Sequence, residues 1–249
     1  MIKHENFEIY VTEDYDSMSK KTADIIANQI NQKNDSVIGL ATGASPEGTY
    51  KELIDKKLDF SGITTFNLDE YVGLSPSDKQ SYAYYMNQHL FDHVNIHKQN
   101  INIPSGVATD ADLECKDYEQ KIEKAGGIDL ILIGIGLNGH IGFSEPAPIF
   151  YSKTHKTQLA PKTIEANKKY FESEEAMPKY AITMGIGTVM HARHILLIAS
   201  GEKKADILHG SMFGDIDPQV PASALQMHQK VTIVADKEAA SKIMKRLGK

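Results

Sequence analysis

The sequence contains only one cysteine, Cys115, among its 249 residues. A lone cysteine cannot close an internal disulfide, and this favours a reducing compartment. Residues 1–10 lack the apolar core of a signal peptide, and no hydrophobic run in the sequence approaches the length of a membrane span. We therefore expect a cytoplasmic protein that has no membrane as a partner.

The sequence also lacks an excess of positive charge. Lysine and arginine number 27 against 33 aspartate and glutamate residues, which gives a net charge of −6. The basic residues are scattered along the chain, so neither nucleic acid nor an anionic membrane surface is an expected partner. A small anion can still bind to such a protein, but only at a local site.

Several enzyme motifs are missing as well. No cluster of histidine, cysteine and acidic residues has metal-ligand spacing, so no metal site is predicted. There is no Gly-x-Ser-x-Gly nucleophile elbow, and the glycine pattern of residues 42–46, between a predicted strand and helix, is neither the Walker loop nor the dinucleotide fingerprint. Cys115 lies in a polar helical stretch without a neighbouring histidine, which indicates a structural role. Together with the acid–base groups and the candidate phosphate-binding loop described below, these absences leave acid–base chemistry on a small phosphorylated molecule as the expected activity.

Short apolar segments alternate with amphipathic helical segments along the whole chain. This order predicts one α/β domain over residues 1–249, with a doubly wound, mostly parallel, Rossmann-like sheet and helices on both faces. Strands are predicted at residues 7–11, 36–41, 64–68, 130–135, 194–199 and 230–235. Helices are predicted at residues 15–32, 47–57, 81–93, 111–125, 201–209, 221–228 and 237–247.

The stretch 146–177 is less regular and carries several prolines and lysines. A long segment attached to the end of a strand that bears polar residues is typical of a lid over a site. The alternative is a surface excursion that covers the edge of the sheet.

Residues 128–146 form the stretch around which the prediction of a site is built. The apolar run 130–135 predicts a buried parallel strand, and Asn138, His140 and Glu145 follow it among closely spaced glycines. Ligands bind beyond the carboxyl ends of strands in open α/β sheets. An amide, an imidazole and a carboxylate at this place favour a functional site over a plain turn with a solvated histidine.

A second candidate stretch lies between a strand and a helix, at Thr42, Gly43, Ala44 and Ser45. Unpaired N–H groups and the helix dipole favour an anion at such a helix start. A plain turn capped by Ser45 is an equally good interpretation of these residues alone. Lys204 lies in the first turn of a later predicted helix, a position that an anion would make more favourable.

A third candidate is the acidic pair Asp69 and Glu70 at the end of the predicted strand 64–68. Adjacent side chains of an extended chain point to opposite faces, so we expect only one of the two to face the site. A partly desolvated Asp69 could take a proton from a carbon next to a carbonyl. A capping or turn pair is the alternative.

Three of these stretches carry a resemblance to a known family. Residues 40–46 read Leu-Ala-Thr-Gly-Ala-Ser-Pro, and residues 66–74 read Phe-Asn-Leu-Asp-Glu-Tyr-Val-Gly-Leu, followed by Ser81-Tyr82. Residues 134–146 read Gly-Ile-Gly-Leu-Asn-Gly-His-Ile-Gly-Phe-Ser-Glu-Pro. With Gly201-Glu202-Lys203-Lys204, these blocks resemble the glucosamine-6-phosphate deaminase (isomerase) family over nearly the whole chain.

The resemblance implies that glucosamine 6-phosphate and water are converted to fructose 6-phosphate and ammonia, without a metal or an organic cofactor. His140 would open the pyranose ring with support from Glu145 and Asn138, and Asp69 would move the proton from C2 towards C1. The phosphate of the substrate would be held by Thr42, Gly43, Ala44, Ser45, Lys169 and Lys204.

The sequence departs from the family pattern at three of these positions. The family often has aspartate where this chain has Asn138, usually has asparagine where it has Ser144, and usually has a phosphate-binding arginine where it has Lys169. Lysine is a point charge and not a bidentate fork. The lid also lacks the effector-site residues of the larger, allosteric hexamers, so we expect a short, non-allosteric form that is a monomer or small homo-oligomer.

The departures keep other functions open. A deaminase for galactosamine 6-phosphate or another amino-sugar phosphate is the first alternative. A 6-phosphogluconolactonase has a related glycine loop, but it would not be expected to continue as Phe143-Ser144-Glu145-Pro146. A non-catalytic sugar-phosphate sensor is the last alternative, because intact motifs do not prove turnover.

Overall fold

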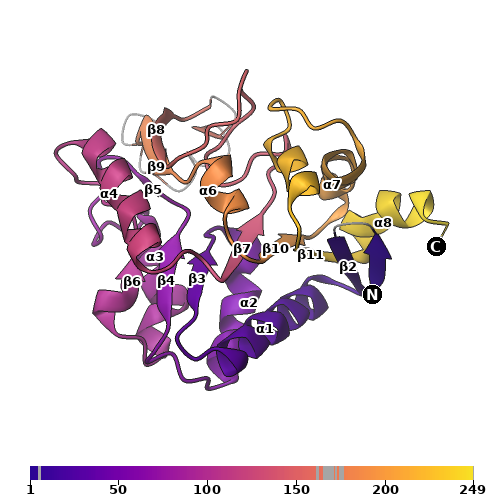
Figure 1. The fold of residues 1–249 in the computed structure, drawn as a ribbon, viewed down its shortest axis with the longest axis horizontal. Coiled ribbons are helices and arrows are strands. Elements are labelled where there is room, and N and C mark those ends of the chain that lie inside the picture. Colours follow the sequence, from indigo (N-terminus) through magenta and orange to yellow (C-terminus); the bar gives the residue numbers. More distant parts are fainter. Residues whose placement is uncertain (5–6, 161–162, 165–170, 172, 174–176, 249) are drawn as a thin grey trace.

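Eight strands form the central sheet of the computed structural model, which describes residues 1–4, 7–160, 163–164, 171, 173 and 177–248 (Figure 1). Their order is β1-β2-β11-β10-β7-β3-β4-β6; β1 runs antiparallel to β2, and all other neighbours are parallel. The strands are β1 (Ile2–His4), β2 (Phe7–Thr12), β3 (Val37–Leu40), β4 (Thr64–Asn67), β6 (Ile101–Asn102), β7 (Leu130–Gly134), β10 (Ile195–Ala199) and β11 (Val231–Asp236). The predicted fold class is confirmed.

The apolar runs of the central strands face two hydrophobic cores. In β7, Leu130 and Leu132 belong to one core, whereas Ile131 and Ile133 belong to the other. A strand that is covered on both faces has no polar face to alternate with its apolar one. This two-sided burial explains why the sequence of β7 is continuously apolar.

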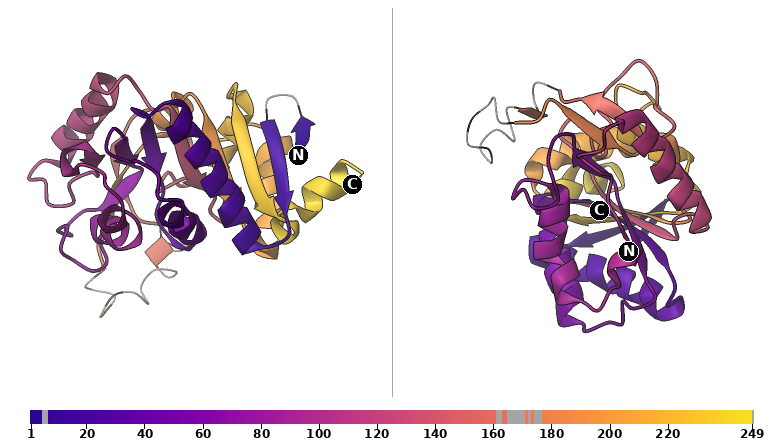
Figure 2. Two further views of the ribbon diagram at one scale, coloured as in Figure 1. Left: turned by 90° about the horizontal axis from the view of Figure 1, so that it is seen from below. Right: turned by 90° about the vertical axis from the view of Figure 1, so that its left-hand side faces the viewer.

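Helices cover both faces of the sheet (Figure 2). One face carries α1 (Tyr15–Gln32), α2 (Ala44–Asp55) and α3 (Tyr82–His89). The other carries α4 (Ala111–Lys124), α6 (Ile186–Met190), α7 (Ala205–Phe213) and α8 (Lys237–Arg246). Short 3-10 helices lie at η1 (Phe91–His93), η2 (Lys98–Asn100), η4 (Glu202–Lys204) and η5 (Pro221–Met227).

A second, three-stranded antiparallel sheet lies beside the central one, and the sequence did not predict it. It consists of β5 (Asp69–Tyr71), β9 (Tyr180–Thr183) and β8 (His155–Gln158). Only Leu68 separates β4 from β5, so the chain passes directly from one sheet into the other. β8 lies inside the stretch 146–177, whose irregular composition did not indicate a strand.

The structure also differs from the prediction at the start of α2 and in two additional short strands. α2 begins at Ala44 and not at the predicted Glu47, so its first turn contains Pro46. The strands β1 and β6 were not predicted, because segments of three and two residues are too short to show a periodic pattern. The predicted helix start at Tyr15 is confirmed, and Asp14 caps it by accepting a hydrogen bond from the N–H of Ser17 at 2.8 Å.

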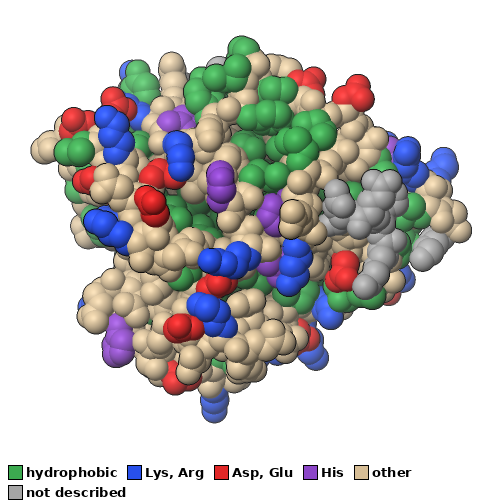
Figure 3. All heavy atoms as spheres, viewed as in Figure 1, with side chains coloured by type: hydrophobic (Ala, Val, Ile, Leu, Met, Phe, Trp, Pro, Cys, Tyr) green, Lys and Arg blue, Asp and Glu red, His purple; other side chains and the backbone are tan. Residues whose placement is uncertain are grey.

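Acidic and basic side chains are interspersed on the face of the molecule drawn in Figure 3. This distribution agrees with the scattered charges of the sequence. None of the helices in the described part of the chain is both long and apolar enough to cross a membrane.

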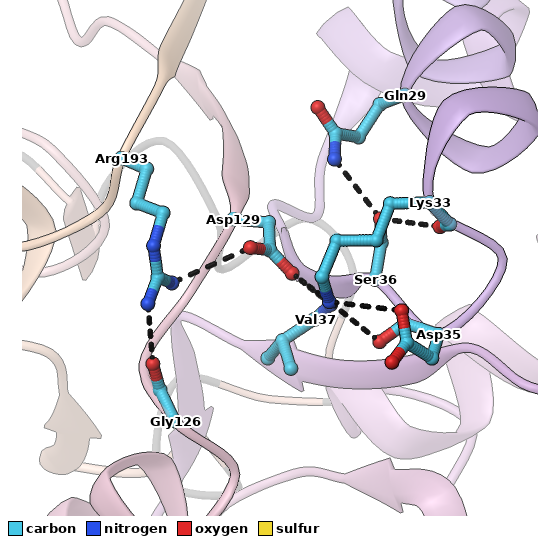
Figure 4. Close-up of polar contacts among 8 residues, drawn as sticks. All are labelled: Gln29, Lys33, Asp35, Ser36, Val37, Gly126, Asp129 and Arg193. Atoms are coloured by element: carbon cyan, nitrogen blue, oxygen red, sulfur yellow. Dashed lines mark hydrogen bonds and ion pairs between the residues drawn. The ribbon is translucent and has the colours of Figure 1, made fainter.

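The parallel pairing of β3 with β7 lies near the middle of the central sheet, and Asp129 extends it by two hydrogen bonds with Val37 (Figure 4). The Asp129 carboxylate accepts the N–H of Val37 at 2.8 Å, and the Asp129 N–H donates to the Val37 carbonyl at 2.8 Å. Lys33 Nζ lies 2.9 Å and an Arg193 guanidinium nitrogen 3.4 Å from the same carboxylate. One nearly buried side chain thus joins β3, β7 and the loop before β10.

We expect Asp129→Ala to lower the free energy of unfolding by about 2–3 kcal/mol, because it leaves the buried Val37 N–H without an acceptor. Asp129→Asn keeps a carbonyl acceptor of the same size and loses only the ionic contacts, so its loss is expected to be smaller. Urea unfolding of the two variants measures the difference. Equal stability of wild type and Asp129→Ala would contradict this role.

Candidate active site

A cavity of about 550 Å³ opens at the carboxyl ends of β3 and β7. Its walls come from the loop after β3, from the start of β5 and from the loop after β7. The structure brings eight of the predicted residues to this cavity: Thr42, Gly43, Ala44, Ser45, Asp69, Asn138, His140 and Lys204. Glu145 lies behind its wall and contacts Asn138 and His140. Lys169 lies outside the described residues.

The loop after β3 leads directly into the N-terminus of α2. Gly43 is the N-cap residue and has a φ of 94°, which a residue with a side chain rarely adopts. No side chain caps this helix, so the interpretation of the loop as a turn capped by Ser45 was wrong. The N–H groups of Ala44 and Ser45 belong to the first turn, where the helix dipole favours an anion.

Lys204 brings a positive charge to the same cavity. It is the only cationic side chain among the described residues that line the cavity, and its ammonium donates to the Ile135 carbonyl at 2.5 Å. Partial burial lowers the pKa of the Lys204 ammonium. An anion bound in the cavity would oppose this shift by stabilising the charged form.

Asn138, His140 and Glu145 form a chain of hydrogen bonds beside the cavity. Asn138 Nδ2 donates to Glu145 Oε2 at 2.7 Å, which turns the amide oxygen of Asn138 towards the imidazole. His140 Nδ1 lies 2.7 Å from that oxygen. An amide oxygen can only accept, so Nδ1 carries the proton and the Nε2 of a neutral imidazole keeps a lone pair. The carboxylate of Glu145 thereby determines the tautomer of His140 through an amide.

Glu145 is held ionised by its neighbours. Burial alone would raise its pKa, but contacts with His140, Thr163 and Asn138 lower the pKa to about 2. Thr163 donates its hydroxyl to Glu145 Oε1 at 2.6 Å. Thr163 is not predictable from the sequence, because a threonine in an irregular segment gives no signal of such a contact.

Two glycines allow the loop after β7 to approach the reactive side chains closely. A Cβ on Gly136 would lie 2.2–2.4 Å from three atoms of the His140 ring. A Cβ on Gly142 would lie 2.8 Å from Asp69 Oδ2, and its φ of 58° also favours glycine. The backbone of this loop therefore packs directly against both His140 and Asp69.

Asp69 and Glu70 have different surroundings, as the alternation of β5 predicted. Asp69 lines the cavity, and burial, followed by the charge of Glu70, raises its pKa to about 8. Glu70 points to the N-terminus of α3, where its carboxylate accepts the N–H groups of Tyr71, Tyr82 and Ala83. Burial raises the pKa of Glu70 to about 7, although these three donors favour its ionised form.

Within the described ranges, no group of three or more histidine, cysteine or acidic side chains could hold a metal ion. Cys115 is buried on α4, and burial raises the pKa of its thiol to about 11. Such a thiol is a poor nucleophile, in agreement with its predicted structural role.

Comparisons with known proteins agree with this geometry. The sequence model of the family "Glucosamine-6-phosphate isomerases/6-phosphogluconolactonase" matches residues 12–234, and the chain belongs to this family. A glucosamine-6-phosphate deaminase of Clostridium botulinum (strain Loch Maree) is 53% identical over 94% of this chain and 98% of its own length. A glucosamine-6-phosphate deaminase of Thermoanaerobacter sp. (strain X514) is 51% identical over 95% of each chain.

Solved structures extend the comparison to the fold. A monomeric glucosamine-6-phosphate deaminase is 45% identical and superposes with a TM-score of 0.91 over 94% of this chain and 99% of its own. A 6-phosphogluconolactonase from Thermotoga maritima gives a TM-score of 0.75 over 93% of this chain and 100% of its own. At 20% identity, the second likeness shows the shared fold alone.

The hydrogen-bond chain predicts how His140 responds to changes at position 138. We expect Asn138→Leu to weaken the preference for the Nδ1–H tautomer, because the acceptor at 2.7 Å is lost and only Glu145 Oε2, at 3.4 Å, still faces Nδ1. Asn138→Asp keeps an acceptor there and should keep the tautomer. Imidazole ¹⁵N chemical shifts at neutral pH distinguish the tautomers. A wild-type ring protonated at Nε2 would contradict the assigned chain.

Proposed function

We propose that this protein converts glucosamine 6-phosphate and water to fructose 6-phosphate and ammonia. The observation that carries the proposal is the meeting of three groups at one cavity: the N-terminus of α2, the imidazole of His140 and the buried carboxylate of Asp69. An anion site, a neutral proton carrier and a separate base are what an aldose–ketose isomerisation of a sugar phosphate requires. The names of the relatives at about 50% identity support the same reaction.

His140 is the group proposed to open the sugar ring. Its Nε2 can take the proton of the C1 hydroxyl and return a proton to the ring oxygen, because Nδ1 is engaged with Asn138. Nδ1 of the imidazole lies 3.4 Å from Glu145 Oε2, so a positive charge that develops on the imidazole is close to this carboxylate. Glu145 and Asn138 therefore act as positioning residues that also stabilise the imidazolium form.

Asp69 is the proposed base for the open-chain sugar. Its carboxylate takes the proton from C2, which gives an enolamine, and returns it to C1 to form an iminium group at C2. Water adds to this iminium carbon, ammonia leaves, and the C2 ketone of fructose 6-phosphate remains. A base with a raised pKa suits this step, because a desolvated carboxylate binds a proton more strongly than one in water.

The phosphate of the substrate is assigned to the helix start, where Thr42, Gly43, Ala44 and Ser45 border the cavity. Lys204 adds charge from another side of the cavity. Binding at this remote group would position C1 and C2 against His140 and Asp69. The proposed role of Lys169 in phosphate binding remains a sequence-based assignment.

Ser144, where the family usually has asparagine, gives no structural reason to expect a different sugar as substrate. Its side chain is buried, and its hydroxyl donates to the Met184 carbonyl at 3.1 Å. Ser144 is also not among the described residues that line the cavity. We therefore treat galactosamine 6-phosphate as a second substrate to be tested in the same assay.

We further propose a monomer or small homo-oligomer without an allosteric response to N-acetylglucosamine 6-phosphate. The monomeric relative at 45% identity supports this assembly. The buried, unpaired Cys115 agrees with the cytoplasmic location proposed from the sequence. Sedimentation at several concentrations tests the assembly state. Substrate saturation with and without N-acetylglucosamine 6-phosphate tests the absence of allostery, and a sigmoidal saturation curve altered by that sugar would contradict it.

Asp69→Asn is expected to reduce ammonia release from glucosamine 6-phosphate by roughly 10²–10⁴-fold, because the amide cannot accept the C2 proton. The assay measures ammonia from glucosamine 6-phosphate and galactosamine 6-phosphate in parallel. No ammonia from either substrate with the wild-type protein would reject the deaminase function and favour a sensor. Equal rates with and without the substitution would reject Asp69 as the base.

The pH dependence follows from the raised pKa of Asp69. The base must be ionised to accept a proton, so kcat/KM should rise about tenfold per pH unit below a pKa of about 8 and level off above it. Glu70→Gln removes the charge that helps to raise this pKa, so its profile should move to lower pH. An unchanged profile in a folded Glu70→Gln variant would contradict the electrostatic coupling of the two acids.

A further inference from the structure

Three tyrosine hydroxyls donate to backbone carbonyls of the loop between β3 and α2. Tyr15 on α1 donates to the Ala44 carbonyl at 2.9 Å, and Tyr85 on α3 donates to the Gly43 carbonyl at 2.7 Å. Tyr50 on α2 donates to the Ala41 carbonyl from a fully buried position. The donors come from three helices that pack on the same face of the sheet.

These hydrogen bonds determine where the N–H groups of the loop point. In a planar trans peptide, the carbonyl of one residue and the N–H of the next point in opposite directions. A hydroxyl that holds the Gly43 carbonyl therefore orients the N–H of Ala44, and one that holds the Ala44 carbonyl orients the N–H of Ser45. These are the first two N–H groups of α2, and both residues line the cavity.

Tyr15 also accepts a hydrogen bond from the N–H of Gly48 at 2.8 Å. Its hydroxyl thus bridges Ala44 and Gly48, the two ends of the first turn of α2. Gly48 makes this approach possible, because a Cβ there would lie 2.4 Å from Ser19 Oγ and 3.0 Å from a ring carbon of Tyr15. The close contact of α1 with α2 is therefore built into the start of the helix that borders the cavity.

Two of the three phenols, Tyr50 and Tyr85, act as donors over the working pH range. Burial raises the pKa of Tyr85 and of Tyr50, so both hydroxyls stay protonated. Each donated hydrogen also engages a carbonyl oxygen whose partial negative charge would otherwise oppose an anion nearby.

We propose that Tyr15 and Tyr85 are positioning residues for phosphate binding, which hold the Gly43 and Ala44 peptide groups with their N–H sides towards the cavity before the substrate arrives. This inference rests on the proposed function, which assigns the substrate phosphate to this loop. Preorganised donors bind an anion without first having to be ordered, so the tyrosines would improve affinity without touching the ligand.

The test removes only the hydroxyl groups. Tyr15→Phe, Tyr85→Phe and the double variant are compared with Tyr84→Phe, a matched control on the same helix whose residue does not line the cavity in the described structure. Inorganic phosphate is titrated by ³¹P NMR, and kcat and KM are measured with glucosamine 6-phosphate. We expect the double variant to weaken phosphate binding and raise KM about tenfold, equal to about 1.4 kcal/mol, with kcat within about twofold of wild type.

A merely structural role gives a different result. The double variant would then melt at a lower temperature, but its phosphate dissociation constant and its KM would stay within about twofold of the control. That outcome overturns the proposal. Because each single variant removes one hydroxyl, either one also reports on affinity if the double variant does not fold.

Ser45→Ala separates this failure from failure of the proposed phosphate site. If phosphate competes with the substrate and Ser45→Ala weakens it, while the double tyrosine variant binds like wild type, only the positioning role is rejected. If phosphate does not bind the wild-type protein, the loop is not the phosphate site and both proposals are rejected.

Discussion

The pairing of β3 with β7 determines where the site can lie. After β3 the chain continues to β4 on one side of the sheet, whereas after β7 it continues to β10 on the other. A cavity forms at such a switch point because the two following loops move apart. Gly39 lets the two strands approach, since a Cβ there would lie 2.4 Å from Ile131 Cγ1. Asp129 extends the pairing at the opposite end of the strands. Loss of this register would separate the loop after β3, where the phosphate is proposed to bind, from His140 in the loop after β7.

The pKa values of the Glu145 and Asp69 carboxyl groups are shifted in opposite directions by their surroundings. Glu145 is surrounded by donors, which keep its pKa at about 2 and make it a permanent anion behind His140. Asp69 is buried beside another acid, and its pKa is therefore near 8. A group that must stay charged is hydrogen-bonded, and a group that must exchange a proton is desolvated. The same functional group, a carboxyl, thus suits two different proposed roles because its surroundings differ.

The sequence predicted the central strands and the long helices because continuous apolar runs and helical periodicity are local signals. It also predicted that only one of Asp69 and Glu70 would face the cavity, since strand alternation is local as well. It did not predict β8 or the hydrogen bond from Thr163 to Glu145, because each depends on a partner distant in the chain. The role of Asn138 needed the positions of both Glu145 and His140. Two of the tyrosines that hold the loop, Tyr15 and Tyr85, are likewise distant from it in the chain.

The net charge of −6 does not prevent the binding of a phosphorylated sugar, because the attraction is short-ranged. At physiological ionic strength, surface charges are screened over about 8 Å. The donors at the start of α2 and the Lys204 ammonium would lie at contact distance from a bound phosphate, where screening has little effect. Backbone N–H groups bring no net charge and lose no side-chain entropy when they bind. Their orientation is then the quantity that the fold must control, and this is the property that we propose the hydroxyls of Tyr15 and Tyr85 to fix through the carbonyls of Ala44 and Gly43.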